Sequence, residues 1–267
     1  MAALSKALIE FANHNRPQPA PGAEIIVTPR YTITLQPDFP VPGPNSVSWI
    51  RCRPDEADEL ITEAHATIAP HRLPVMWTLD PETEPRNFGD YLMARYIHPD
   101  PHPDAAVMVL PIDAMVAVPA PAGLEIRDGL SDLATFRSAD AVAAEAFMSD
   151  SIADSRGHIE MLERRRLNWL AAGNRHILLA TVDGEPAGTA GLTVFAQGAI
   201  INGGSVRPKF RGRGVYRALV AARLEIARSA GVSGLAVWGG AMSAPILERL
   251  GFQTVGWRRF YLDTSTA

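Results

Sequence analysis

The sequence predicts an α/β protein with a mixed, mostly antiparallel sheet flanked by helices. Two observations support this fold class. Apolar strand patterns alternate with helices that have one apolar face along most of the 267-residue chain. Three successive strand patterns between residues 176 and 206 are joined by short turns, which is typical of an antiparallel meander. The composition agrees, because 47% hydrophobic and 20% charged residues are ordinary for a globular protein.

The first half of the chain carries short and less regular elements. The N-terminal segment reads as an amphipathic helix, and Lys6 and Glu10 interrupt the apolar run that a signal peptide would need. The elements expected after it are strands 23–28, 31–36 and 46–52, helix 55–67, strand 74–79, helix 85–96 and strand 105–110.

The second half has clearer patterns. The helix expected at 214–230 places Val215, Leu219 and Ile226 on one face, and Gly231 follows it as a helix-ending glycine does. The other expected elements are strand 124–129, helices 133–148 and 158–173, strands 176–182, 187–195, 199–206 and 234–239, helix 244–250 and strand 252–263.

A Pro- and Ala-rich segment at 111–123 is the expected boundary between two domains, 1–118 and 123–267. The two halves resemble each other in order: a strand leads through an Arg-Pro pair into a helix, then a strand, a helix and a strand. We therefore expect a tandem arrangement in which the first half is a degenerate copy of the second.

Several functional classes are excluded by composition. A net charge of −4 and a pI near 6.0 disfavour a general nucleic-acid or anionic-membrane surface. Asp113 and three prolines interrupt the apolar window 105–124, so we expect no membrane span. A single cysteine, Cys52, permits no intrachain disulfide and suits the cytoplasm. The segment 98–104 alternates His and Asp with proline in an extended loop, so its side chains spread apart and we expect no metal site.

The segment "SVRPKFRGRGVYRALVAARL" at 205–224 concentrates positive charge in an acidic protein. Its cations are Arg207, Lys209, Arg211, Arg213 and Arg217. Gly212 and Gly214 stand immediately before the expected helix, where backbone N–H groups can approach an anion without a Cβ in the way. The matching place in the first half carries Asp55, Glu56 and Asp58, which would repel an anion. The sequence therefore predicts one phosphate site, in the second half.

Three phosphate-binding patterns can be compared with this loop. A P-loop needs Lys-Ser/Thr after its second glycine, and none follows Gly214. A dinucleotide fingerprint needs a third glycine where this chain has Arg217. That fingerprint also follows a strand of a parallel sheet, whereas this loop follows an antiparallel meander. The pattern [RQ]-x-x-G-x-[GA] fits at Arg211 and Gly214 but not at Tyr216.

With this loop and the closing "LERLGF" at 247–252, residues 124–263 resemble the GCN5-related N-acetyltransferase (GNAT) family. The resemblance implies a GNAT fold, with acetyl-CoA as co-substrate. It also implies cofactor contacts from Gly204, Ser205 and Val206 to the pantetheine arm, and from Arg211, Gly212, Arg213, Gly214, Val215, Tyr216 and Arg217 to the phosphates. Tyr216 departs from the small residue usual at its place.

Acetyl transfer to an amine needs a deprotonated nucleophile, a polarised thioester carbonyl and an acid for the leaving thiolate. The resemblance implies that a backbone N–H at Val206 or a neighbour polarises the carbonyl. In the family the acid is often a tyrosine four residues before the final Gly-Phe, and this chain has Leu247 there. Ser243 and Tyr261 are candidate substitutes, and the catalytic acid and base stay unassigned.

Two functional hypotheses follow from these features. The first is an N-acyltransferase that moves an acetyl group from acetyl-CoA to the primary amine of a small molecule or a peptide. The alternative is a non-catalytic acyl-CoA-binding or protein-interaction module, which Leu247 favours. Both hypotheses place the protein in the cytoplasm with no nucleic-acid or membrane partner. The sequence does not identify the acceptor amine or the oligomeric state.

Overall fold

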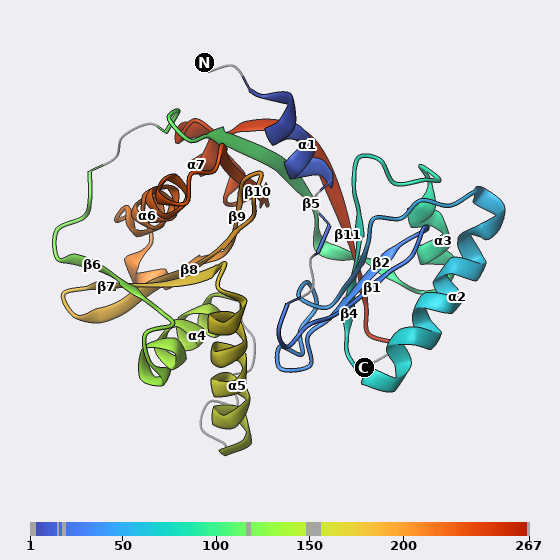
Figure 1. The fold of residues 1–267 in the computed structure, drawn as a ribbon, viewed down its shortest axis with the longest axis horizontal. Coiled ribbons are helices and arrows are strands. Elements are labelled where there is room, and N and C mark those ends of the chain that lie inside the picture. The colour runs from blue at the N-terminus through green and yellow to red at the C-terminus, as the bar shows by residue number, and fades with distance from the viewer. Residues whose placement is uncertain (1–3, 15, 18–19, 116–118, 148–155, 266–267) are drawn as a thin grey trace. The chain divides into compact units, whose positions relative to one another are not determined.

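The computed structural model describes residues 4–14, 16–17, 20–115, 119–147 and 156–265 (Figure 1). Its residues group into two compact units. The larger unit comprises Met1–Ala12, Met108–Val237 and Ser243–Gln253, and the smaller unit comprises Asn13–Val107, Trp238–Met242 and Thr254–Ala267.

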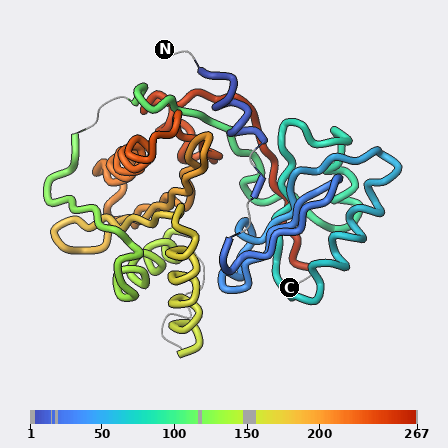
Figure 2. Tube along the Cα trace, in the orientation of Figure 1, coloured from blue at the N-terminus to red at the C-terminus, as the bar shows by residue number. Residues whose placement is uncertain are grey.

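The sheet of the larger unit contains the predicted meander. Its strands lie in the order β6 (Leu124–Asp128), β7 (Arg175–Val182), β8 (Glu185–Val194), β9 (Ala199–Val206), β10 (Gly234–Gly239) and β5 (His98–Pro111). The pairs from β6 to β9 are antiparallel, and β9 pairs with β10 in parallel. The back-and-forth course of β7, β8 and β9 can be followed along the chain trace (Figure 2). The mixed, mostly antiparallel sheet is therefore confirmed.

Helices cover both faces of this sheet. α4 (Leu133–Phe147) and α5 (Arg156–Ala172) lie on one face, and α6 (Val215–Ser229) and α7 (Ala244–Arg249) lie on the other (Figure 1). Val215 and Leu219 of α6 are buried against Val206, as the predicted apolar face requires. α6 thus holds the end of β9 and the loop that follows it.

The smaller unit repeats this topology. β1 (Glu24–Val27), β2 (Thr32–Leu35) and β3 (Ser46–Ser48) form an antiparallel meander, and β4 (Val75–Leu79) pairs with β3 in parallel. α2 (Ala57–Ile68) connects β3 to β4, just as α6 connects β9 to β10. α3 (Phe88–Ala94) follows β4. The shared order of three antiparallel strands, a helix and a parallel strand agrees with a two-half architecture.

Each unit is completed by a strand from the other half of the sequence. β11 (Gln253–Asp263) lies antiparallel to β4, from Asp263 opposite Val75 to Arg259 opposite Leu79. The last residues of β5, Met108–Pro111, belong to the larger unit and lie next to β10. The compact units therefore differ from the expected halves 1–118 and 123–267 at their closing strands.

Two elements differ from their predicted form. The strand expected at 46–52 ends at Ser48, because Trp49 has a φ of +56° that extended pairing does not allow. The proline-rich segment from His98 was expected to be a loop, and it forms the exposed start of β5. Alternating prolines have the φ of an extended chain, and they are tolerated where a strand leaves one edge unpaired.

Two features are absent from the described residues. No helix in them is long and apolar enough to cross a membrane. They also contain no group of three His, Cys, Asp or Glu side chains that could hold a metal ion.

The exchange of closing strands leads to a prediction about truncation. We expect a fragment of residues 124–267 to be unstable or insoluble, since it lacks the end of β5 and exposes β11 without β4. Soluble yield and a thermal melt by circular dichroism, compared with the full chain, would measure this. As a control, co-expression with residues 1–123 should restore a soluble complex. A monomeric fragment with a cooperative melt close to that of the full chain would contradict the prediction.

Candidate functional site

The loop between β9 and α6 is built by a tight turn. A short 3-10 turn at Pro208–Phe210 buries the Phe210 ring under the loop. Gly212 and Gly214 then take φ values of +76° and +88°. Only glycine adopts these left-handed angles without strain, so the Arg-Gly-Arg-Gly sequence is a requirement of the backbone.

The N-terminus of α6 is open to an anion. Gly214 is its N-cap residue, no side chain among the described residues caps it, and its first turn has no acidic residue. The first backbone N–H groups of a helix have no partner within the helix and carry a partial positive charge. The start of α6 therefore presents the groups that bind phosphate in other helices.

The five cations of the loop have different roles. Arg207 forms an ion pair with Glu145 at 2.9 Å, and Lys209 pairs with Glu185. The other three, Arg211, Arg213 and Arg217, are exposed and form no ion pair within the described part of the chain. They are the cations available to a ligand.

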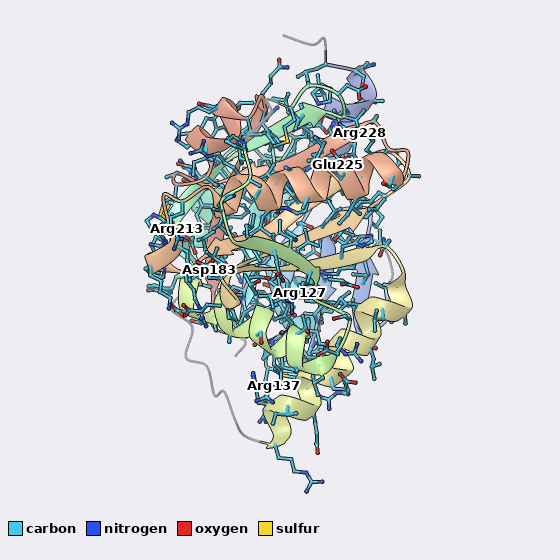
Figure 3. The ribbon with its side chains drawn as sticks, turned by 90° about the vertical axis from the view of Figure 1, so that its left-hand side faces the viewer. Arg127, Arg137, Asp183, Arg213, Glu225 and Arg228 are labelled. Carbon is cyan, nitrogen blue, oxygen red and sulfur yellow. The ribbon has the colours of Figure 1, made fainter. Side chains whose placement is uncertain are left out.

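Two of these arginines are held near the turn. Nε of Arg211 donates to the carbonyl of Val206 at 3.2 Å, which fixes the guanidinium beside the end of β9. The guanidinium carbon of Arg213 lies 5.3 Å from the centre of the Phe210 ring, at the surface of the molecule (Figure 3). The turn therefore carries positive charge that is partly positioned before any ligand binds.

β9 has an irregular middle. Asn202 pairs with Gly191 and Ser205 with Thr189, so Gly203 and Gly204 together face one residue of β8. This is a β-bulge, and the φ of +55° at Gly203 accommodates it. Bulges of this kind redirect backbone groups next to functional sites.

The outer part of β9 is free of β10. In the described residues, the parallel pairing covers Ala199 and Ile200, and β9 then continues to Val206. The Ser205 hydroxyl is buried and has no hydrogen-bond partner among those residues. An unpaired strand edge and an unsatisfied hydroxyl fit a ligand with amide groups, and pantetheine has two.

A cluster below the bulge was missed in the sequence. Arg223 of α6 is 1% exposed, and its Nη1 donates to the carbonyls of Gly191 at 3.3 Å and Asn202 at 3.5 Å. Burial raises the pKa of the Tyr216 hydroxyl, while Arg223 and Ser243, which lie next to it, oppose that rise. The seven-residue spacing from Tyr216 to Arg223 places both on one helix face, and this spacing was the available signal.

The two candidate acids named from the sequence lie in different environments. Ser243 precedes α7 in the larger unit and lies beside the Tyr216 hydroxyl. Tyr261 lies in the smaller unit, where it is 4% exposed and packs in the apolar core that contains Trp77. Burial in that core disfavours Tyr261 as the catalytic acid. Leu247 is fully buried, so it cannot act as an acid.

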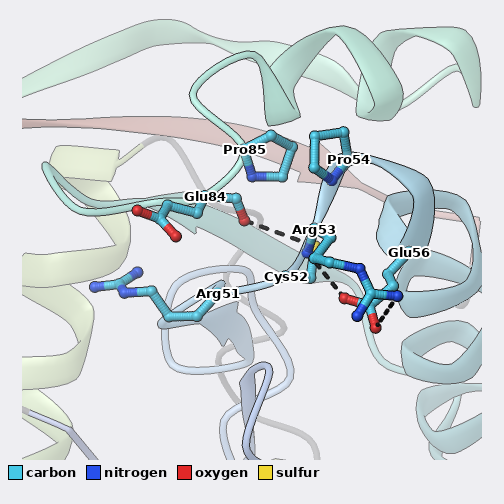
Figure 4. Close-up of a pocket in the computed structure, with 7 residues that line it drawn as sticks. All are labelled: Arg51, Cys52, Arg53, Pro54, Glu56, Glu84 and Pro85. Carbon is cyan, nitrogen blue, oxygen red and sulfur yellow. Dashed lines mark hydrogen bonds and ion pairs between the residues drawn. The ribbon is translucent and has the colours of Figure 1, made fainter.

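The corresponding place in the smaller unit is built differently (Figure 4). Arg53 pairs with Asp55 at 3.1 Å and with Glu56 at 3.2 Å. The Glu56 carboxylate also accepts a hydrogen bond from the Arg53 backbone N–H at 2.9 Å, so it occupies the position that an anion would take. Arg51 is likewise paired, with Asp80 at 3.0 Å.

In the smaller unit the chain segments that follow β3 and β4 are joined by hydrogen bonds, whereas β9 and β10 of the larger unit separate at the corresponding place. The Cys52 N–H donates to the Glu84 carbonyl at 3.0 Å, and the Glu84 N–H donates to Ile50 at 3.1 Å. These bonds border a shallow cavity of 480 Å³, lined by Arg51, Cys52, Arg53, Pro54, Glu56, Glu84 and Pro85. Its cations are paired with carboxylates, which makes it a poor phosphate site.

This contrast predicts the binding stoichiometry. Calorimetry should report one acetyl-CoA per chain, because the α6 end has an uncapped helix terminus beside three exposed arginines, whereas Glu56 fills the corresponding place in the smaller unit. A titration that fits two equivalent sites would show that the smaller unit binds the cofactor as well.

The position of Arg211 predicts a moderate binding defect. Arg211→Ala should weaken acetyl-CoA binding by about 1.5–3 kcal/mol, the range for a hydrogen bond to a charged group. The defect should shrink as salt rises, since part of the interaction is screened. Arg228→Ala is the matched control, because Arg228 is exposed at the other end of α6 and pairs with Glu225 (Figure 3). Equal affinities of the two variants at low salt would remove Arg211 from the site.

Comparisons with known proteins agree with this geometry. Residues 144–252 match the model of the Acetyltransferase (GNAT) family. A GCN5-related N-acetyltransferase from Kribbella flavida has a similar structure, with a TM-score of 0.65 and 16% identity over 91% of this chain and 90% of that chain. A tandem GNAT protein from the clavulanic acid biosynthesis pathway has a TM-score of 0.58 and 16% identity over 99% of this chain and 90% of that one. At these identities the likeness is one of fold. No curated protein matches the chain in sequence.

Proposed function

We propose that this protein transfers an acetyl group from acetyl-CoA to the primary amine of a small molecule or a peptide, since residues 144–252 match the model of the GNAT family. The observation that carries the proposal is the uncapped N-terminus of α6, with two left-handed glycines and three exposed arginines around it. A pyrophosphate group fits this arrangement of donors and charge.

The geometry supports an assignment of residues to each part of the cofactor. The phosphates would be held by the N–H groups that begin at Val215 and by the guanidinium groups of Arg211, Arg213 and Arg217. The open edge of β9 from Gly204 to Val206 would pair with the amides of the pantetheine arm, and the buried Ser205 hydroxyl would gain a partner. These are the residues that the sequence predicted for the site.

Acetyl-CoA supplies an activated acetyl thioester, and the chain has to orient and polarise it. The bulge at Gly203–Gly204 interrupts the β8–β9 ladder, and so it can turn a backbone N–H toward the thioester carbonyl. Such a donor stabilises the oxyanion that forms when the amine attacks. The bulge lies on β9 and the loop follows directly after this strand, so the chain would hold the thioester and the phosphates a short, defined distance apart.

The activity can be tested with the full chain. Purified protein, acetyl-CoA and a panel of primary amines should release free CoA thiol above the rate without protein, for at least one class of amine. The panel should include polyamines, aminoglycosides, amino acids and peptides with a free N-terminus or lysine. Protein with Gly214→Val is the matched control and should show no release. Thiol release at equal rates by both proteins would place the activity elsewhere.

The buried Leu247 favours one alternative. It removes the proton donor expected near the end of the last helix, as in a protein that keeps the cofactor and has lost the chemistry. Under this alternative the chain is an acyl-CoA-binding or protein-interaction module. Tight acetyl-CoA binding without thiol release for any amine of the panel would support the module and exclude the transferase.

A further inference from the structure

A buried arginine lies beneath the bulge of β9. The Arg223 side chain is 1% exposed, and no carboxylate of the described residues forms an ion pair with it. Its Nε donates to the carbonyl of Leu219 at 3.0 Å, and its Nη1 reaches the carbonyls of Gly191 and Asn202. Its Nη2 has no well-aligned hydrogen-bond partner among those residues. Burying a cation without an anionic partner costs folding free energy, so the retained charge of Arg223 indicates a functional role.

The group next to this cation is a phenol. Tyr216 is the titratable side chain that acts on Arg223 in the described structure. A Cβ added at Gly204 would lie 3.0 Å from Cε2 of Tyr216 and 3.5 Å from Nη2 of Arg223, so both side chains lie directly against β9 at the bulge. A Cβ at Gly204 would be in tight contact with the Tyr216 ring, so glycine leaves this ring room beside β9.

The third member of the cluster is Ser243, at the start of α7. Its hydroxyl interacts with the Tyr216 hydroxyl, so the phenol lies between a serine and an arginine. Tyr216 itself is half-buried, which leaves part of it accessible to a ligand along β9. The cluster thus lies beside Gly204 in the bulge of β9, where the proposed function places the thioester.

We propose that Tyr216 is the proton donor to the leaving thiolate of CoA, with Arg223 and Ser243 as positioning residues for its hydroxyl. This inference rests on the proposed transferase function. It supplies, from the first turn of α6, the acid that α7 lacks because it carries Leu247.

The step balances without a further reactant. The amine nitrogen attacks the thioester carbon and forms the C–N bond. Collapse of the tetrahedral adduct breaks the C–S bond, and the sulfur takes its electron pair and the proton of Tyr216. The phenolate is stabilised by the Arg223 guanidinium, and it recovers the proton that the nitrogen of the adduct loses. The products are the amide and free CoA thiol.

The charges around Tyr216 suit this task. Burial raises the pKa of the phenol, so it is protonated at neutral pH and able to donate. Burial also lowers the pKa of Arg223 to about 10, so the guanidinium is still charged at neutral pH. A cation that stays charged beside the phenol favours the phenolate when it forms.

Tyr216→Phe is the test, because it removes the hydroxyl and keeps the ring. In the full chain kcat should fall about 100-fold, within the range for loss of a general acid, while the KM for acetyl-CoA changes little. Tyr96→Phe is the matched control, since Tyr96 is 86% exposed in the smaller unit and should leave kcat unchanged. Thermal melts of both variants should match that of the wild type.

A second measurement does not depend on turnover. In the complex with free CoA, the thiol should ionise at a pH at least about one unit higher in Tyr216→Phe than in the wild type, because the hydroxyl that stabilises the thiolate is gone. Thiolate absorbance of the bound CoA reads this directly. A merely structural role of Tyr216 would leave the ionisation unchanged.

The positioning residues give a third comparison. Ser243→Ala and Arg223→Lys should each lower kcat less than Tyr216→Phe does. Arg223→Lys should also shift the alkaline limb of the pH profile of kcat, because lysine keeps the charge but changes its position relative to the Tyr216 hydroxyl.

The outcomes separate the inference from the function on which it rests. An active wild type with a Tyr216→Phe variant of similar kcat and unshifted thiol ionisation would overturn the role of Tyr216 and leave the transferase in place. A wild type that binds acetyl-CoA but releases no thiol with any amine would overturn both.

Discussion

Gly214→Val is expected to reduce acetyl-CoA binding at least about 100-fold, from tight binding to none that calorimetry detects. The φ of +88° at Gly214 lies where a β-branched residue is strained by about 1–3 kcal/mol, so the turn would rearrange. Rearrangement would move the N–H groups of the first turn of α6 that are proposed to bind the phosphates, and an added Cβ would also lie 3.4 Å from Cγ of Pro121. Calorimetric titration with acetyl-CoA measures the effect.

Gly231→Val is the matched control for this experiment. Gly231 ends the same helix, has a φ of +72° and has no neighbour within 4 Å of an added Cβ. It should lose similar stability and keep native affinity. If Gly214→Val remains folded by circular dichroism and binds acetyl-CoA like the wild type, the loop is not the cofactor site and the proposed transferase falls with it.

Asp263→Asn is expected to lower the free energy of unfolding by about 3 kcal/mol, because a buried charged acceptor loses its partners. The carboxylate is 1% exposed and accepts hydrogen bonds from His65 at 2.7 Å and Trp77 at 3.0 Å. It also accepts two from Ser265, at 2.6 and 3.0 Å. In asparagine one of the two acceptor oxygens is replaced by an NH2 group, which cannot accept a hydrogen bond from these donors. Urea unfolding at neutral pH measures the loss.

The same site predicts a dependence on pH. Burial alone would raise the pKa of Asp263, but hydrogen bonds from His65, Ser265 and Trp77 outweigh it and lower the pKa from 3.8 to about 2. A depressed carboxylate pKa stabilises the fold above the unfolded value of 3.8. We therefore expect the advantage of wild type over Asp263→Asn to shrink by about 2 kcal/mol as the pH falls from about 5 to about 2.

Asp104→Asn is the control for Asp263. Asp104 pairs with Arg259 of β11 at 2.8 Å, but both side chains are about half exposed, so its loss should change stability by less than about 1 kcal/mol. A constant stability difference between wild type and Asp263→Asn across the acidic range would show that the carboxylate is not ionised in the folded protein.

Much of the fold was readable in the sequence because its signals are local. The period of the apolar residues at Val215 and Leu219 predicted α6, and the short turns of the meander predicted β7 to β9. The phosphate loop was equally readable, since Gly212 and Gly214 are demanded by the backbone itself. Its prediction as a cofactor site still awaits the binding experiments.

The features that the sequence did not reveal depend on tertiary contacts. Arg223 reads as a solvated cation at a helical position, and only the bulge above it explains its burial. Tyr261 lies close to the site in sequence, but β11 crosses into the smaller unit and carries it into another core. The pairing of β4 with β11 joins residues that are distant along the chain, and no local pattern encodes it.

The exchanged closing strands have a consequence for synthesis on the ribosome. Val75 of β4 lies opposite Asp263, so the smaller unit lacks a strand of its sheet until β11 has been made, almost 190 residues after β4. Domains usually fold one after another as they emerge, starting from the N-terminus. Here β4 keeps an exposed edge until β11 leaves the exit tunnel, by which time most of the larger unit has been translated. The strand exchange therefore couples the folding of the smaller unit to synthesis of a segment that follows the larger one.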